Sequence, residues 1–192
     1  MPDRFDTKTA HGENSAAILT IGHSTRAIGE FTELLLAHDV TLLVDVRTVP
    51  RSRHNPQFNS DVLPQSLAAA GIRYRHMPGL GGLRHARRDS PNRGWQNASF
   101  RGFADYMLTE EFAANLLELM ALAGNERVAV MCAEAVPWRC HRSLIADALL
   151  VRGWSVAHIM GKGAPHAHEL TRFARLEGGV LVYPAEEEGE GA

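Results

Sequence analysis

The stretch Val128–Val151, VAVMCAEAVPWRCHRSLIADALLV, decides the fold. It begins as an apolar run typical of a buried strand, turns through Pro137 and Trp138, and resumes as a helix that starts near Cys140. Two thiols, a carboxylate, an imidazole and two guanidiniums therefore fall within one strand-to-helix turn. In open α/β sheets, ligands bind beyond the carboxyl ends of the strands. We expect a binding site at this turn.

The same alternation of strand and helix continues along the chain in both directions. Short apolar runs predict five strands, at Ile18–Ile21, Thr41–Val46, Ile72–Met77, Val128–Met131 and Ser155–Met160. Strands that are separated by helices pair in parallel, because a parallel pair needs a long crossover. We predict a single three-layer α/β domain whose mostly parallel five-stranded sheet carries helices on both faces.

Local signals predict where helices begin and end. The hydroxyls of Ser24 and Thr25 can cap a first helix, Asn59 or Ser60 a second that stops at Gly71, and Thr109 a third that stops at Gly124. A last helix is predicted over His166–Leu176, and Val180–Tyr183 is predicted to add a short edge strand. The loop 78–100 has no periodicity, and loops of this length are usually functional or disordered.

Length and composition favour one soluble domain. With 192 residues and 45% hydrophobic content, the chain can bury one full core. No segment approaches the roughly 20 apolar residues of a membrane span, and the polar N-terminus lacks a signal peptide, so we expect a cytoplasmic protein without membrane contact. Residues 1–16 and the acidic tail 184–192 are predicted to be disordered, which leaves the domain at residues 17–183.

The two cysteines, eight positions apart, do not form the disulfide framework of a secreted domain and are interpreted as reduced thiols. A helix start and neighbouring arginines lower a thiol pKa, so either Cys132 or Cys140 is a candidate nucleophile; the alternative is a buried structural role. Candidates for proton transfer are Glu134, Asp45 and His23. Asp45 has a second interpretation, as the ion-pair partner of Arg47.

Arginine dominates the middle of the chain, where ten arginines between Arg47 and Arg101 face only Asp61 and Asp89. Arginine binds phosphate and carboxylate with a fork of donors, although a solvated surface run gives the same composition. Phe58, in the proline-bounded loop after Arg47, either stacks on a base or fills the core. The candidate anion-binding residues are Arg47, Arg51, Arg139, His141, Arg142 and Ser143.

Several motifs occur in order along the chain: TIGHSTR at 20–26, VDVR at 44–47, PRSRHNPQFN at 50–59, LGGLR at 80–84, RGFADYM at 101–107 and MCAEAVPWRCHRSLIAD at 131–147. Together they resemble the bacterial and archaeal domain-of-unknown-function family 488. The resemblance covers about residues 18–162 and implies an α/β fold. It implies no activity, because the family has no assigned function.

Three functional hypotheses follow. The leading one is an anion-binding, thiol-containing pocket at the strand ends that acts on a small anionic, phosphorylated or nucleotide-like substrate. The second is binding of DNA or RNA through the arginine-rich region 47–101. The third is a metal-binding redox or regulatory protein, using sulfur and nitrogen from Cys132, Cys140, His141 and His23. No CxxC or HExxH spacing is present, so we assign no metal site, and the cofactor is unknown.

Overall fold

The computed structural model describes residues 17–185, and a six-stranded sheet lies at its centre. The first 16 residues and residues 186–192, which include most of the acidic tail, lie outside the described part, so their predicted disorder stays a prediction. The sheet order is β3-β2-β4-β1-β5-β6. Five strands are mutually parallel: β1 (Ile18–Gly22), β2 (Leu42–Asp45), β3 (Arg73–His76), β4 (Val128–Cys132) and β5 (Val156–Ile159). The predicted parallel sheet is confirmed.

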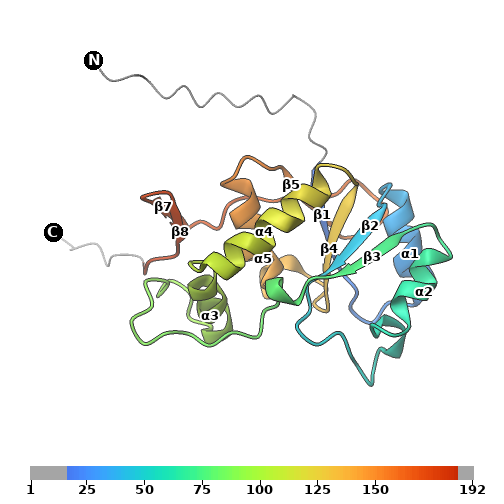
Figure 1. Cartoon of the computed structure of the whole chain (residues 1–192), viewed down its shortest axis with the longest axis horizontal. Coiled ribbons are helices and arrows are strands. Elements are labelled where there is room, and N and C mark those ends of the chain that lie inside the picture. Colours follow the sequence, from blue (N-terminus) through green and yellow to red (C-terminus); the bar gives the residue numbers. More distant parts are fainter. Residues whose placement is uncertain (1–16, 186–192) are drawn as a thin grey trace, which may run out of the picture.

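Helices cover both faces of this sheet, as predicted. Figure 1 shows α1 (Ile28–Ala37) and α2 (Leu63–Ala68) on one side, and α3 (Ala98–Tyr106), α4 (Glu110–Ala123) and α5 (Arg142–Leu150) on the other. Three short 3₁₀ helices, η1 (Pro56–Phe58), η2 (Pro78–Leu80) and η3 (Pro137–Arg139), each begin with proline. Proline suits this position because its fixed φ is helical and it lacks only an N–H that the first turn leaves unpaired.

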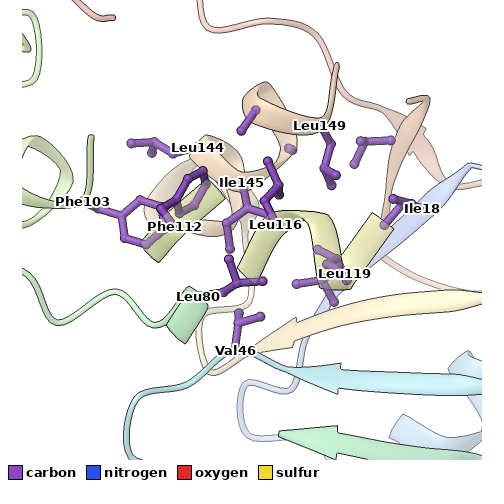
Figure 2. Packing of buried hydrophobic residues seen from close by; sticks show 14 of the residues in the cluster. Ile18, Val46, Leu80, Phe103, Phe112, Leu116, Leu119, Leu144, Ile145 and Leu149 are labelled. Atoms are coloured by element: carbon purple, nitrogen blue, oxygen red, sulfur yellow. The ribbon is translucent and has the colours of Figure 1, made fainter. Parts of the chain in front are cut away.

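Side chains of each central strand enter two cores in alternation. Val128 and Val130 of β4 join the core under α3, α4 and α5, whereas Ala129 and Met131 join the core under α1 and α2. Every residue of β4 is buried, as expected for a parallel strand covered on both faces. In the larger core, Figure 2 shows side chains of α4 packed against those of α5 and of neighbouring segments, including Phe112, Leu116, Leu119, Leu144, Ile145 and Leu149.

The predicted last helix over His166–Leu176 is wrong. The segment instead forms β6 (His166–Ala167), antiparallel to β5, then a loop, then β7 (Arg175–Glu177). Buried Asp147 of α5 accepts hydrogen bonds from the His168 ring and from the Thr171 backbone N–H, which hold the segment away from helical geometry. The predicted strand near Val180 exists as β8 (Val180–Val182), but it pairs with β7 in a separate hairpin and not with the main sheet.

The predicted helix boundaries are partly correct. Thr109 caps α4, because its Oγ1 accepts a hydrogen bond from the Phe112 N–H, and Gly71 follows α2 with a φ of +75°. The first helix starts at Ile28 after an Ala27 N-cap with no side-chain cap, so the predicted cap by Ser24 or Thr25 is wrong. The second helix starts at Leu63, after η1 and a turn, and not at Asn59 or Ser60.

The long loop 78–100 is ordered. Asp105 of α3 accepts hydrogen bonds from the Arg87 N–H, the Ser90 hydroxyl and the Asn92 amide. Asn92 is fully buried and also accepts from the Tyr183 N–H. These contacts fasten the loop at its centre and bring its glycine-rich beginning and its end to the carboxyl edge of the sheet.

Candidate functional site

Two adjoining cavities open at the carboxyl ends of β1, β2 and β4, the edge where the sequence predicts a site. The first has a volume of about 420 Å³ and the second about 430 Å³. Both are lined by Arg47, Val49, Ala133 and Glu134. The first is also lined by Thr48, Gly82, Leu83, Ser99, Phe100, Cys132, Arg139, Cys140 and His141, and the second by His23, Ser24, Thr25, Arg51, Ser52, Asn55 and Ala135.

The two cysteines meet in the wall of the first cavity. The turn through η3 folds back so that Cys140, just before α5, faces Cys132 at the end of β4, and the two sulfurs are in contact. A separation of eight residues around a turn returns the chain to its own strand end. The Cα atoms lie 7.7 Å apart, beyond the roughly 4.4–6.8 Å of most disulfides, so the contact does not establish a bond. The interpretation of the two cysteines as reduced thiols stays a prediction.

The side chain of Arg142 binds the protein itself. The residue is 1% exposed, and its Nε donates to the Cys132 sulfur at 3.1 Å. The two terminal nitrogens donate to the Thr20 hydroxyl at 3.3 Å and to the Glu134 backbone carbonyl at 2.7 Å. None of these acceptors is a carboxylate. Burial lowers the pKa of Arg142 to about 10, which still leaves it charged at neutral pH.

His141 and Ser143 lie at the start of α5, where the Ser143 hydroxyl is bound to the backbone and Nε2 of His141 has no hydrogen-bond partner among residues 17–185. The Ser143 hydroxyl donates to the Cys140 carbonyl, and Nδ1 of His141 lies 3.6 Å from the Cys140 sulfur. Burial lowers the pKa of His141 to about 4, so the ring is neutral at physiological pH. Gly82 packs against this ring, because a Cβ at Gly82 would lie 2.5 Å from Nδ1 of His141.

Asp45, Arg47 and His23 form a buried network beneath both cavities. The Arg47 guanidinium donates to both Asp45 carboxylate oxygens, at 2.9 and 2.6 Å, and Asp45 also accepts from the Tyr74 hydroxyl. The ion pair, which was the second interpretation of Asp45, is what the structure contains. Asp45 is fully buried and lines neither cavity, so the proton-transfer role is not supported by its position.

His23 is likewise occupied at both nitrogens. Its Nδ1–H donates to the Ser24 carbonyl at 2.8 Å, which leaves Nε2 to accept from Arg47 at 3.2 Å. Burial lowers the pKa of His23 to about 4, and its ring stacks on Phe58 with centroids 4.3 Å apart. Phe58 is completely buried, so it fills the core and offers no surface to a base.

The exposed charges of the site are Arg51, Arg139 and Glu134. Arg139 and Glu134 border the first cavity, whereas Arg51 borders the second. Among residues 17–185, no side chain forms an ion pair or hydrogen bond with either guanidinium. Of the six predicted anion-binding residues, Arg47, Arg139 and His141 line the first cavity, and Arg47 and Arg51 line the second. Arg51 and Arg139 are exposed, whereas the side chains of Arg47, Arg142 and Ser143 bind the protein itself.

The arginine-rich region is partly paired within the protein, whereas Arg51, Arg53, Arg88 and Arg93 are exposed and form no ion pair among residues 17–185. Arg73 pairs with Glu126, Arg75 with Glu118 and Arg87 with Asp89. Arg84 lies over the Tyr106 ring, 3.5 Å from its centroid, and donates to backbone carbonyls of its own loop. This region gives no support to a phosphate-backbone interface.

Two further features bear on the alternatives. In the part of the chain that the structure describes, no group of three or more His, Cys, Asp or Glu side chains is arranged to hold a metal ion. Every helix within residues 17–185 is too short or too polar to span a lipid bilayer.

A family model, Domain of unknown function DUF488, matches residues 27–149. The chain belongs to this family. Comparison with curated proteins gave no match, and neither did comparison with solved structures. The resemblance noted from the motifs is thereby confirmed, and the match runs from the start of α1 almost to the end of α5, which includes both cysteines.

Sequence reasoning missed one group of residues in this DUF488 domain. Thr20, His158, His168 and Asp147 form a buried hydrogen-bonded series that reaches Arg142. His158 lies inside the apolar strand SVAHIM, and a polar residue in a run that is buried on both faces requires a partner. The need of a buried polar residue for a partner was the signal that could have marked His158. It does not identify His168 as the partner, because His168 lies in a segment that was predicted to be a helix.

Proposed function

We propose that this protein is a thiol–disulfide oxidoreductase for small molecules, with Cys132 as the attacking thiolate and Cys140 as the second thiol. One observation carries the proposal: two cysteine sulfurs meet in the wall of a cavity while a buried arginine donates a hydrogen bond to one of them. A nearby guanidinium favours the thiolate, which is the nucleophilic form of cysteine.

The choice of Cys132 as the attacking group follows from Arg142. A buried cation needs a compensating anion, and the side-chain nitrogens of Arg142 contact a sulfur, a hydroxyl and a carbonyl. In the reduced protein, ionised Cys132 supplies the negative charge at 3.1 Å. Cys140 receives only a backbone N–H, from Arg142 at 3.5 Å, and the weakly basic His141 ring. It is therefore the less activated thiol.

The proposed reaction balances with a small disulfide as oxidant. The Cys132 thiolate attacks one sulfur of the substrate, the substrate S–S bond breaks, and the first product leaves as a thiolate that takes a proton from water. Cys140 then loses its proton to water and attacks the Cys132 sulfur of the mixed disulfide. This step forms the Cys132–Cys140 bond and releases the second thiol product. Two electrons pass from the protein to the substrate, and two molecules of an external thiol return them as they are oxidised to a disulfide.

The cavity surroundings indicate the character of the substrate. Val49 and Leu83 border the first cavity and are 63% and 74% exposed, so one part of its mouth is apolar. Arg139 places a positive charge at the same cavity. A ligand with an apolar part and a negatively charged group matches both, since exposed guanidinium forks bind carboxylate and phosphate. The earlier expectation of an anionic ligand is retained in this narrower form.

The test is a turnover and trapping experiment on the whole chain. The reduced protein is mixed with oxidised glutathione, as an anionic disulfide, or with 2-hydroxyethyl disulfide, as a neutral one, and released thiol is measured. Cys132→Ser should abolish release. Cys140→Ser should stop after one exchange and retain a glutathione adduct on Cys132, detectable as added mass that a thiol reductant removes. Arg139→Ala should slow the anionic substrate more than the neutral one.

Two results would reject the proposal. One is thiol release that is the same for the wild type and for Cys132→Ser. The other is a Cys140→Ser protein that acquires no adduct although its Cys132 reacts with a small alkylating agent. A control variant, Thr32→Val in α1, removes a hydroxyl that donates to the Ile28 carbonyl and should not change either assay.

A further inference from the structure

A continuous series of hydrogen bonds connects Cys132 to Asp147 through four intervening side chains. Arg142 donates to the Cys132 sulfur and, through Nη1, to the Thr20 hydroxyl. Thr20 is bonded to Nδ1 of His158 at 2.8 Å, and Nε2 of His158 to Nδ1 of His168 at 3.0 Å. Nε2 of His168 is bonded to the Asp147 carboxylate at 2.8 Å.

For neutral histidines, the two ends of the series fix the direction of every bond in it. Arg142 has donors only, and ionised Asp147 has acceptors only. His168 must therefore donate from Nε2 and accept at Nδ1, and His158 must donate from Nε2 and accept at Nδ1 from the Thr20 hydroxyl. The remaining lone pairs of Thr20 accept from Arg142. One tautomer of each neutral histidine satisfies the whole series, and all donors point toward Asp147.

Burial explains why the series has to be complete. Asp147 is fully buried, Arg142 is 1% exposed, and the His158 residue is 7% exposed. The two opposite charges are not in direct contact, although both belong to α5. Two imidazoles and a hydroxyl span the gap between them, and burial lowers the pKa of His158 to about 4, which agrees with a neutral His158 ring. Each unmade bond in such a network would leave a buried polar group unsatisfied.

We propose that Thr20, His158, His168 and Asp147 are positioning residues that hold the Arg142 guanidinium oriented toward Cys132. This proposal rests on the proposed function, because it concerns the ionisation of the attacking thiol. Asp147 anchors the far end of the series, and the Thr20 hydroxyl fixes the rotation of the guanidinium so that Nε faces the sulfur.

Other groups act on the same side chains. His166 and Asp147 face His158 together with His168 and Arg142, and the Tyr183 hydroxyl donates to Asp147 at 2.9 Å. Near Arg142 lie the charges of Glu134 and Arg26. None of these groups replaces the Thr20 contact, so removal of the Thr20 hydroxyl isolates the relay from Arg142 with the least other change.

The decisive measurement is the pH profile of Cys132 alkylation by iodoacetamide in the reduced full chain, with Cys140→Ser in every protein. In this background, Thr20→Val should raise the apparent thiol pKa by about one unit, which is a tenfold loss of thiolate at pH values below the pKa. Thr32→Val is the matched control and should leave the profile unchanged. Asp147→Asn should act in the same direction as Thr20→Val, and thermal melting followed by circular dichroism shows which variants are folded.

Nitrogen-15 NMR of the histidine side chains gives an independent reading. In the wild type, His158 should be neutral with the proton on Nε2 at pH 7. A proton on Nδ1 of His158 would contradict the relay, whatever the thiol does.

The outcomes separate this inference from the proposed function. If Arg142→Lys raises the thiol pKa while folded Thr20→Val leaves it unchanged, the relay is refuted and the activated thiol stands. If Arg142→Lys leaves the pKa unchanged, the proposed activation of Cys132 fails, and the inference fails with it. A shift in folded Thr20→Val and in Arg142→Lys, with none in Thr32→Val, supports both.

Discussion

Replacement of Asp45 by Asn tests whether the Asp45–Arg47 pair is a structural element. The carboxylate accepts from Arg47 at its Nε, a terminal nitrogen and the backbone N–H, and from the Tyr74 hydroxyl, at 2.9, 2.6, 3.1 and 2.8 Å. Asn keeps the shape but removes the charge and places an NH₂ group against donors. Arg47 would remain buried without a counter-charge, with the amide oxygen of the new side chain, the Phe58 carbonyl and the His23 ring as its acceptors.

For this reason, we expect Asp45→Asn to reduce the free energy of unfolding strongly. An uncompensated buried charge destabilises a protein by about 3–5 kcal/mol, whereas loss of one neutral hydrogen bond costs about 1 kcal/mol. Asp45→Asn should lower the free energy of unfolding in urea by about 3–5 kcal/mol, and Tyr74→Phe should lower it by about 1 kcal/mol. Adding Arg47→Met to Asp45→Asn should recover part of the loss, because it removes the unpaired cation.

A single outcome would refute the reasoning. If Asp45→Asn costs less than about 1 kcal/mol, in the range of an ordinary neutral hydrogen bond, the pair does not hold this edge of the sheet. Asp45 would then return as a candidate for proton transfer. Activity of the variant is informative only after its stability is known, since a partly unfolded protein loses activity for any reason.

Three further predictions concern stability. His23, His141 and His158 each have a pKa lowered by burial to about 4, against about 6.5 when unfolded, so the unfolded chain binds more protons between these values. The free energy of unfolding in urea should therefore fall as the pH drops from 6.5 toward 4. The fall should be up to roughly 1.4 kcal/mol per pH unit for each histidine, and His23→Gln should make the dependence of stability on pH less steep. Gly22→Ala should destabilise the protein strongly, because the new Cβ would overlap the Glu134 carbonyl. Gly29→Ala has open space around it in α1 and should stabilise the protein by about 0.5–1 kcal/mol. Equal effects of the two substitutions on stability would contradict the packing described. Thr109→Ala should cost about 1 kcal/mol through loss of the α4 cap, and a melting temperature equal to that of the wild type would argue against it.

The fold was predictable because its signals are local and repeated. Short apolar runs separated by helical periods give parallel strands almost by necessity, and Thr109 and Gly71 mark helix ends by their own chemistry. The segment 166–176 was misread because a long-range contact decides its conformation. The carboxylate of Asp147 captures His168 and the Thr171 N–H, and nothing within the segment reveals this partner.

The site was predictable in its location and much less in its contacts. The carboxyl edge of the sheet follows from the topology, so the cluster around Cys132 could be placed there from sequence. Whether an arginine faces solvent or the protein depends on packing, however. Arg47 and Arg142 were expected to bind an anion, and burial turns both inward, toward Asp45 and Cys132. Only exposed guanidiniums such as Arg139 keep the expected availability.

The contacts of Tyr183 affect the order in which the domain can assemble during translation. Its backbone N–H binds Asn92 in the long loop, and its hydroxyl binds Asp147 in α5. A nascent chain that has emerged only as far as α5 already contains both cysteines and Arg142, yet it lacks His158, His168 and Tyr183. The dithiol would thus be exposed to cellular oxidants before its electrostatic surroundings exist. Ribosome-bound intermediates in which α5 has emerged while residues 156–183 are still inside the exit tunnel should consequently show Cys132 with the reactivity of an ordinary thiol.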